Sequence, residues 1–189
     1  MNKLPANFEL GRYGLHVRLV CEEDAEFIVT IRTNAHNAKY IHDTDVSVEA
    51  QRDWIRNYKI REVAGEEYYL LFELNGVPQG VYRIYNRHEN WCVTGSWVFS
   101  PKADRFSAIK GFVITHEVVF DVLEHRFVHD IDGVNLQNKQ VLGVMKLIGG
   151  KFLDIRQDPK GQYQTLDIYK EDFYANRDLL LRMVGVETK

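Results

Sequence analysis

An arginine set among aromatic residues is the first candidate for chemistry in this chain. Arg83 lies inside a predicted strand, between Tyr82 and Tyr85. A planar guanidinium binds a phosphate or a carboxylate through several donors at once. We therefore assign Arg83 and Tyr85 to the binding of an anionic substrate group, with an ion pair between Arg83 and a neighbouring acid as the alternative.

Two adjacent titratable residues, His88 and Glu89, lie in the predicted loop between two central strands. Either side chain is suited to take a proton from a reacting group, as a general base does. We take both as candidate catalytic residues, while a polar hairpin loop without catalytic function has the same composition. His116 lies in the middle of a predicted helix and is more typical of a packing residue.

The helix that begins near Ser107 is a candidate binding site for a phosphate group. The first turn of a helix has unpaired N–H groups and the positive end of the helix dipole. Lys102, Arg105 and Lys110 place positive charge around this turn. A solvated cationic loop is the alternative interpretation of the same residues.

The composition restricts the kinds of protein that this chain can be. The chain has 189 residues, of which 45% are hydrophobic and 27% charged, as expected for a single domain over residues 1–189. The net charge of −3 gives no indication of a nucleic-acid or membrane partner. Cys21 and Cys92 are too few and too far apart in sequence to indicate a disulfide scaffold or a zinc site. We expect a cytoplasmic protein without a bound metal.

Hydrophobic periodicity and turn residues predict the order of the elements. Asn75 and Gly76 form a two-residue hairpin signal, and Asn34–Val46 has the composition of an irregular loop. The predicted strands are His16–Val20, Tyr68–Leu74, Gln79–Asn86, Cys92–Phe99, a stretch within Phe127–Leu136, Phe152–Gln157 and Gln162–Tyr169. The predicted helices run from Glu22 toward Asn34, from Ser47 to Arg61, from Ser107 to Leu123, from Lys139 to Ile148 and from Lys170 to Val184.

This order predicts an α+β fold (mixed α/β). Antiparallel hairpins in the middle of the chain and one parallel crossover imply a mixed, mostly antiparallel central sheet with helices on both faces. The C-terminal half resembles the GNAT superfamily of N-acyltransferases, because an amphipathic helix, a strand, and Asn138 eleven residues before Gly149 follow one another in the same order. The resemblance covers most of the chain up to Tyr169, with the helix Lys170–Val184 as an addition.

The resemblance implies acetyl-CoA as the co-substrate. Members of this family open the sheet between the strands before and after the acyl-CoA helix, here Gly95–Ser100 and the strand that ends near Leu136. An opened strand leaves backbone groups unpaired, and an amide-bearing ligand can satisfy them. The pantetheine arm would pair with the earlier strand at Trp97, Val98 and Phe99.

The family pattern for the pyrophosphate, Gln/Arg-x-x-Gly-x-Gly/Ala, falls on Ala103, Phe106 and Ala108. Only Ala108 fits this pattern, since Ala103 replaces the polar residue and Phe106 replaces the first glycine. By resemblance we assign the phosphates of the cofactor to the segment formed by Ala103, Asp104, Arg105, Phe106, Ser107 and Ala108.

By the same resemblance Asn138 bonds the pantetheine, and a plain helix cap is its alternative role. Seven residues later many members have a tyrosine that protonates the departing thiolate, where this chain has Met145. We assign Asn138 and Met145 to the cofactor. Because the thiolate of coenzyme A leaves readily, the open alternatives are no acid at all, a water, or one of Tyr163 and Tyr169 on the last hairpin.

The resemblance predicts an N-acetyltransferase that moves an acetyl group from acetyl-CoA to a primary amine of a small molecule, by direct attack in a ternary complex. A nucleotide-linked amino sugar is the favoured acceptor, and we expect a monomer or a homodimer. A protein N-terminal acetyltransferase and a non-catalytic acyl-CoA-binding protein are the alternatives.

Overall fold

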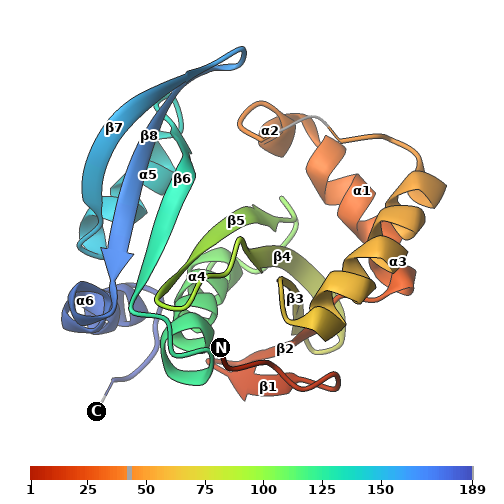
Figure 1. Ribbon diagram of the computed structural model, residues 1–189, viewed down its shortest axis with the longest axis horizontal. Coiled ribbons are helices and arrows are strands. Elements are labelled where there is room, and N and C mark those ends of the chain that lie inside the picture. Colours follow the sequence, from red (N-terminus) through yellow and green to blue (C-terminus); the bar gives the residue numbers. More distant parts are fainter. Residues whose placement is uncertain (42–43, 189) are drawn as a thin grey trace.

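The centre of the fold is one twisted sheet of eight strands in the computed structural model, which describes residues 1–41 and 44–188 (Figure 1). In this part of the chain the strand order is β1–β2–β3–β4–β5–β6–β8–β7, and every neighbouring pair is antiparallel except β5 and β6. The strands are β1 (Glu9–Arg12), β2 (Leu15–Leu19), β3 (Tyr68–Leu74), β4 (Val77–Tyr85), β5 (Trp91–Phe99), β6 (Phe127–Asn135), β7 (Lys151–Asp158) and β8 (Gly161–Tyr169).

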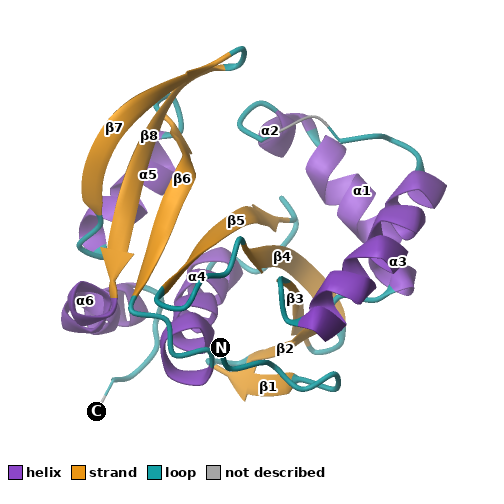
Figure 2. Cartoon of the chain, viewed as in Figure 1, coloured by secondary structure: helices purple, strands orange, loops and turns teal. Residues whose placement is uncertain are grey.

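Helices cover both faces of the sheet (Figure 2). They are α1 (Ala25–Thr33), α2 (Ala35–Ala38), α3 (Val48–Ala64), α4 (Ser107–Glu117), α5 (Lys139–Leu147) and α6 (Lys170–Met183), with a π-helical turn, Val118–Val122, after α4. The core between α1, α3 and the sheet is separate from the core that α4, α5 and α6 share with its other face. The predicted fold class is thereby confirmed, including the added C-terminal helix.

Two elements were not predicted from the sequence. β1 is four residues long and mostly exposed, so it has no apolar alternation that would indicate a strand. The short helix α2 lies within Asn34–Val46, which was predicted to be an irregular loop. Residues 42 and 43 of that segment lie outside the described residues. A helix of one turn has too few residues to show a period, which is why the loop prediction was wrong at Ala35–Ala38.

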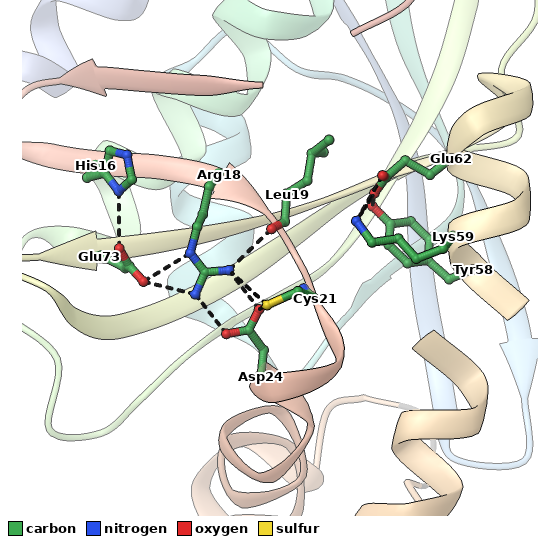
Figure 3. A network of polar contacts seen from close by, with 9 residues as sticks. All are labelled: His16, Arg18, Leu19, Cys21, Asp24, Tyr58, Lys59, Glu62 and Glu73. Carbon is green, nitrogen blue, oxygen red and sulfur yellow. Dashed lines mark hydrogen bonds and ion pairs between the residues drawn. The ribbon is translucent and has the colours of Figure 1, made fainter. Parts of the chain in front are cut away.

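α1 is tied to the sheet through Arg18 of β2 (Figure 3). The Arg18 guanidinium donates two hydrogen bonds of 2.8 Å to Asp24 and two, of 3.0 and 3.1 Å, to Glu73 of β3. The Asp24 carboxylate also accepts the backbone N–H of Cys21 at 2.8 Å, so it caps the chain where the side chain of Cys21 is a poor cap. These bonds fix the start of α1, whose last turn contains Arg32, a donor to Ser96 of β5.

α3 is anchored to β3 by a tyrosine on its buried side. The Tyr58 hydroxyl accepts the backbone N–H of Tyr69 at 2.9 Å and donates to Glu62, which also pairs with Lys59 (Figure 3). Tyr58 is fully buried, and its ring stacks on Trp54 one turn earlier. The position of Trp54 over the sheet therefore follows from one buried hydroxyl and one ring contact.

The parallel strands β5 and β6 share only the beginning of their lengths. Their paired residues are Trp91 with Phe127 and Cys92 with Val128, after which the strands diverge (Figure 1). α4 follows β5 and packs closely beneath it, because Gly111 leaves room for the Phe99 ring, whose nearest atom lies 2.5 Å from where a Cβ would stand. The predicted splay of the sheet is thus present between β5 and β6.

Candidate active site

Among the residues that the structure describes, the edge of β5 that faces β6 has no strand partner after Cys92. Within this stretch β5 contains a bulge, because the register with β4 gains one residue between the pairs Arg83–Gly95 and Val81–Val98. Ser96 in the bulge has a φ of 52°, in the left-handed region. Such strain in a non-glycine residue persists only where the surroundings hold it, and here Arg32 Nη1 donates to Ser96 Oγ at 3.2 Å.

Two connected cavities fill the opening between β5 and β6. The inner cavity, of about 350 Å³, lies between the two strands and α5. The outer cavity, of about 290 Å³, lies between the end of β5, α2 and the first turns of α4 and α5. Both are lined by Tyr40, Ile41, Trp97, Asn138 and Val141, so they form one passage through the open sheet.

Residues predicted to hold the pantetheine meet in this passage. Trp97, Val98 and Phe99 line the outer cavity together with Ala108 and Asn138. The Asn138 side-chain oxygen accepts the N–H of Val141 at 3.3 Å and so caps α5. Its amide nitrogen has no hydrogen-bond partner among the described residues, which leaves a donor for a ligand. An extended amide-bearing chain along β5 fits these free groups.

The predicted phosphate segment is only partly available to a ligand. The N–H of Asp104 is bonded to Gln79 Oε1 at 2.7 Å, and the N–H of Phe106 to Asp104 Oδ1 at 3.2 Å. The side chain of Arg105 is exposed and lies over the Phe106 ring. Of this segment, Ala108 alone lines the outer cavity. Within this segment the first turn of α4, rather than the loop before it, is thus the part that borders the outer cavity.

Arg83 and Tyr85, which were predicted to bind substrate, both line the inner cavity. Arg83 forms an ion pair with Glu67, as the alternative interpretation held, and its guanidinium lies over the rings of Trp54 and Tyr85. The Tyr85 hydroxyl donates to Asp132 on β6. Burial raises the pKa of Tyr85 above its usual range, and the neighbouring carboxylate raises it further. Tyr85 is thus a donor at any physiological pH.

Asp130 of β6 is a functional candidate that the sequence analysis missed. It lines the inner cavity with Asn138 and Met145, and its Oδ1 accepts the N–H of Gly133 at 2.8 Å. Burial raises the pKa of Asp130 to about 7, and the charge of Asp132 raises it further, against opposing effects of the Gly133 N–H, His129 and Arg156. Acids are depleted in strands, so two of them within Phe127–Leu136 were the available signal.

Of the four predicted acids and bases, Tyr163 alone lines the passage. Tyr163 is buried at the inner cavity near Met145, whereas Tyr169 lies at the other end of β8, opposite Phe127. The ring of His88 stacks on Trp91, where β5 and β6 are paired, and neither His88 nor Glu89 lines the passage.

His116 of α4 is fully buried among aromatic rings. Burial lowers its pKa to about 4, so its imidazole is neutral at physiological pH. This surrounding is that of a packing residue, and His116 does not line the passage either.

Neither a membrane-crossing helix nor a metal-binding cluster of side chains occurs in the described residues. None of the helices in residues 1–41 and 44–188 combines the length and the apolar character that crossing a bilayer requires. The same residues contain no group of three or more His, Cys, Asp or Glu side chains placed to hold a metal ion.

Solved structures similar to this chain include several acetyltransferases. FdhC, described as a nucleotide-linked sugar GNAT and solved in its apo form, is 30% identical with a TM-score of 0.79, and the match covers 95% of this chain and 99% of that one. Mycobacterium smegmatis RimJ, solved in complex with CoA-disulfide, is 16% identical with a TM-score of 0.76, over 97% and 92% of the two chains. A ribosomal-protein-S5-alanine acetyltransferase from Vibrio fischeri is 12% identical with a TM-score of 0.74, over 88% and 99%.

No protein-family model matches the sequence, and no curated protein matches it either. At 16% and 12% identity, the likeness to the RimJ and S5-alanine acetyltransferase structures establishes a shared fold alone. The 30% identity to FdhC extends over nearly the whole of both chains, and so reflects more than a shared fold.

Proposed function

The chain belongs to the GNAT superfamily and is an acyltransferase, and from this premise we propose that it transfers an acetyl group from acetyl-CoA to the amine of a small molecule. The observation that carries the proposal is the passage between β5 and β6. It brings a free strand edge, the Asn138 amide and the Asp130 carboxylate to one continuous space. A thioester donor and an amine acceptor need such a space to meet, with a proton acceptor beside them.

The acetyl-CoA would enter through the outer cavity, with its pantetheine amides against the edge of β5 and the Asn138 side chain. The thioester carbonyl would then lie beside the bulge at Ser96, where a backbone N–H of β5 can donate to its oxygen. The acceptor would occupy the inner cavity from the side of Arg83 and Tyr85. In this arrangement the amine would lie between the thioester and Asp130.

Asp130 is the group we assign as general base. An acceptor amine arrives mainly as ammonium at neutral pH, and it cannot attack before it loses a proton. Asp130 takes that proton, because a pKa of about 7 leaves a substantial fraction ionised at neutral pH. The nitrogen then forms the C–N bond as the C–S bond breaks. The second proton of the nitrogen ends on the coenzyme A sulfur through water or Tyr163, or is released to solvent.

A nucleotide-linked amino sugar is the acceptor class we favour. FdhC, a nucleotide-linked sugar GNAT, is 30% identical to this chain over nearly its whole length. The inner cavity also has arginine and tyrosine side chains, which suit a polar, anionic acceptor. The structural neighbour that acts on a ribosomal protein is only 12% identical and establishes the fold alone, so it supports the protein N-terminal acceptor less than FdhC supports the sugar nucleotide.

The test is a panel of amines assayed for free thiol with acetyl-CoA as donor. It contains nucleotide-linked amino sugars, the same sugars without the nucleotide, and a peptide with an N-terminal alanine. We expect the nucleotide-linked sugars to give the highest kcat/KM. Calorimetry with coenzyme A in parallel shows that the protein is folded and binds the co-substrate. Binding of coenzyme A without thiol release from any amine would contradict the proposal, and a preference for the peptide would move it to the protein N-terminal class.

A further inference from the structure

A third cavity, of about 240 Å³, adjoins the inner cavity on the side of α1 and α3. Its walls include Gln51 and Trp54 of α3 and Tyr69 of β3. Arg32, Arg83 and Ser96 line both this cavity and the inner one, so the two meet at the β5 bulge. A ligand whose amine lies near Asp130 can therefore extend past Ser96 into this third space.

Arg32 stands at the junction of the two cavities, and within residues 1–41 and 44–188 it has no ion-pair partner. Its Nε donates to Thr44 Oγ1 at 2.8 Å and its Nη1 to Ser96 Oγ at 3.2 Å, and both partners are neutral. Among the described residues no carboxylate lies within ion-pair distance of Arg32. Asp45 lines the same cavity, but it is exposed and accepts the N–H of Ser47 at 2.8 Å.

Arg83, on the other side of the junction, differs from Arg32 in this respect. Arg83 forms an ion pair with Glu67, whose side chain is only 5% exposed and which also pairs with Arg61. A half-buried guanidinium without a counter-charge favours the binding of an anion, since the anion supplies the missing partner. We therefore expect a phosphate to bind to Arg32 rather than to Arg83.

The far wall of the third cavity is aromatic and includes Trp54, over whose ring the Arg83 guanidinium also lies. The Trp54 ring is held by stacking on Tyr58, with ring centroids 5.7 Å apart, and by an edge contact with Tyr69 at 5.9 Å. An aromatic wall fixed in this way loses little entropy when it contacts a ligand. Gln51 lines the same wall, and its side-chain amide can both donate to and accept from the edge of a heterocycle.

We infer that this third cavity binds the nucleotide end of the acceptor, with Arg32 as the anchor for its diphosphate and the Trp54–Gln51 wall against its base. The inference rests on the proposed function, because it assigns the far end of the same acceptor whose amine is acetylated. It also specifies which arginine confers selectivity for the phosphorylated acceptor.

The test is calorimetric titration of UDP and dTDP into the full chain saturated with coenzyme A. Saturation is needed because coenzyme A has a diphosphate of its own, and its site must be filled. We expect a nucleoside diphosphate to bind, uridine or thymidine to bind much more weakly, and inorganic pyrophosphate to compete. Arg32→Gln should weaken the nucleoside diphosphate at least about 10-fold, as expected when a charge-assisted hydrogen bond is lost. Arg32→Lys should retain part of the affinity.

Arg52→Gln is the matched control, since Arg52 is an exposed arginine of α3 that pairs with Glu49 and lines none of the three cavities. It should bind the nucleotide as the unmodified chain does. Unchanged coenzyme A affinity in every variant shows that the fold is intact. If Arg32→Gln does not fold, Trp54→Leu replaces it. We expect Trp54→Leu to lower the affinity for the nucleoside diphosphate more than the affinity for pyrophosphate.

Equal nucleotide affinity in Arg32→Gln and the unmodified chain would overturn the inference, and so would the absence of any binding in the presence of coenzyme A. This readout needs no acetyl transfer. Nucleotide binding that depends on Arg32, without turnover of any amine, would therefore contradict the proposed function and leave the site standing. Turnover of unphosphorylated amines alone, with no nucleotide bound, would contradict the nucleotide site and leave the acetyltransferase activity standing.

Discussion

The Tyr85 hydroxyl of β4 donates a hydrogen bond to the Asp132 carboxylate of β6, across the strand that lies between them. The phenol passes over Gly95 of β5, where a Cβ would stand 2.8 Å from the Tyr85 oxygen. A residue larger than glycine at position 95 would therefore displace the ring. The bond links the two sides of the open sheet near Asp130, at the point where strand pairing no longer holds them together.

Removal of this hydroxyl should destabilise the protein. In Tyr85→Phe the partly buried Asp132 loses its donor, which we expect to lower the free energy of unfolding by about 1–3 kcal/mol. Urea unfolding measures the change. Tyr40→Phe is the control, because Tyr40 also lines the passage but its hydroxyl has no hydrogen bond among the described residues. Equal unfolding curves for Tyr85→Phe and the unmodified chain would show that the bond contributes nothing to stability.

The pH profile of the reaction should report the titration of Asp130. Only the ionised carboxylate can act as the base, so kcat/KM should rise with pH through about 7 and then level off. Asp130→Asn should lower kcat by about 10²–10⁴-fold and remove this rise. Asp154→Asn, at an exposed position of β7, should leave both unchanged. A variant at Asp130 that keeps the original profile would assign the base elsewhere.

The same carboxyl group should make stability depend on pH. The pKa of Asp130 is raised from 3.8 to about 7 in the folded chain. Between these values the folded chain holds a proton that the unfolded chain has released, so this contribution is full at low pH and is lost as pH rises through 7. Asp130→Asn has no such proton to lose. The free energy of unfolding of Asp130→Asn, relative to that of the unmodified chain, should therefore increase from pH 5 to pH 8 in denaturant unfolding. A difference between the two that does not change with pH would contradict the raised pKa of Asp130.

Two substitutions at Asn138 should separate its capping role from its ligand role. Asn138→Asp keeps an oxygen that can cap α5 but removes the amide donor. Asn138→Ala removes both. We expect either change to weaken acetyl-CoA binding by about 1–2 kcal/mol, on the order of tenfold, in calorimetry. Asn138→Ala alone should also lower the melting temperature. Full affinity in both variants would leave Asn138 as a helix cap only.

The amino-acid sequence by itself determined the elements whose signals are local. The strand Tyr68–Leu74 was predicted with the bounds that the structure has, since a continuous apolar run buried on both faces needs no partner to be recognised. The Asn75–Gly76 turn, the start of α4 at Ser107 and the Asn138 cap were predicted for the same reason. Each depends on residues within a few positions of one another.

Tertiary structure decided which of these residues meet. Tyr163 and Tyr169 lie on one strand, about 20 Å apart along it, and only the path of β8 shows that Tyr163 reaches the passage. Arg83 pairs with Glu67 across a hairpin, whereas Arg32 of α1 has no ion-pair partner among the described residues. Asp130 is an ordinary carboxylate until burial between β5, β6 and α5 raises its pKa. Burial and charge pairing arise between elements that are distant in sequence, so no local pattern of residues could predict them.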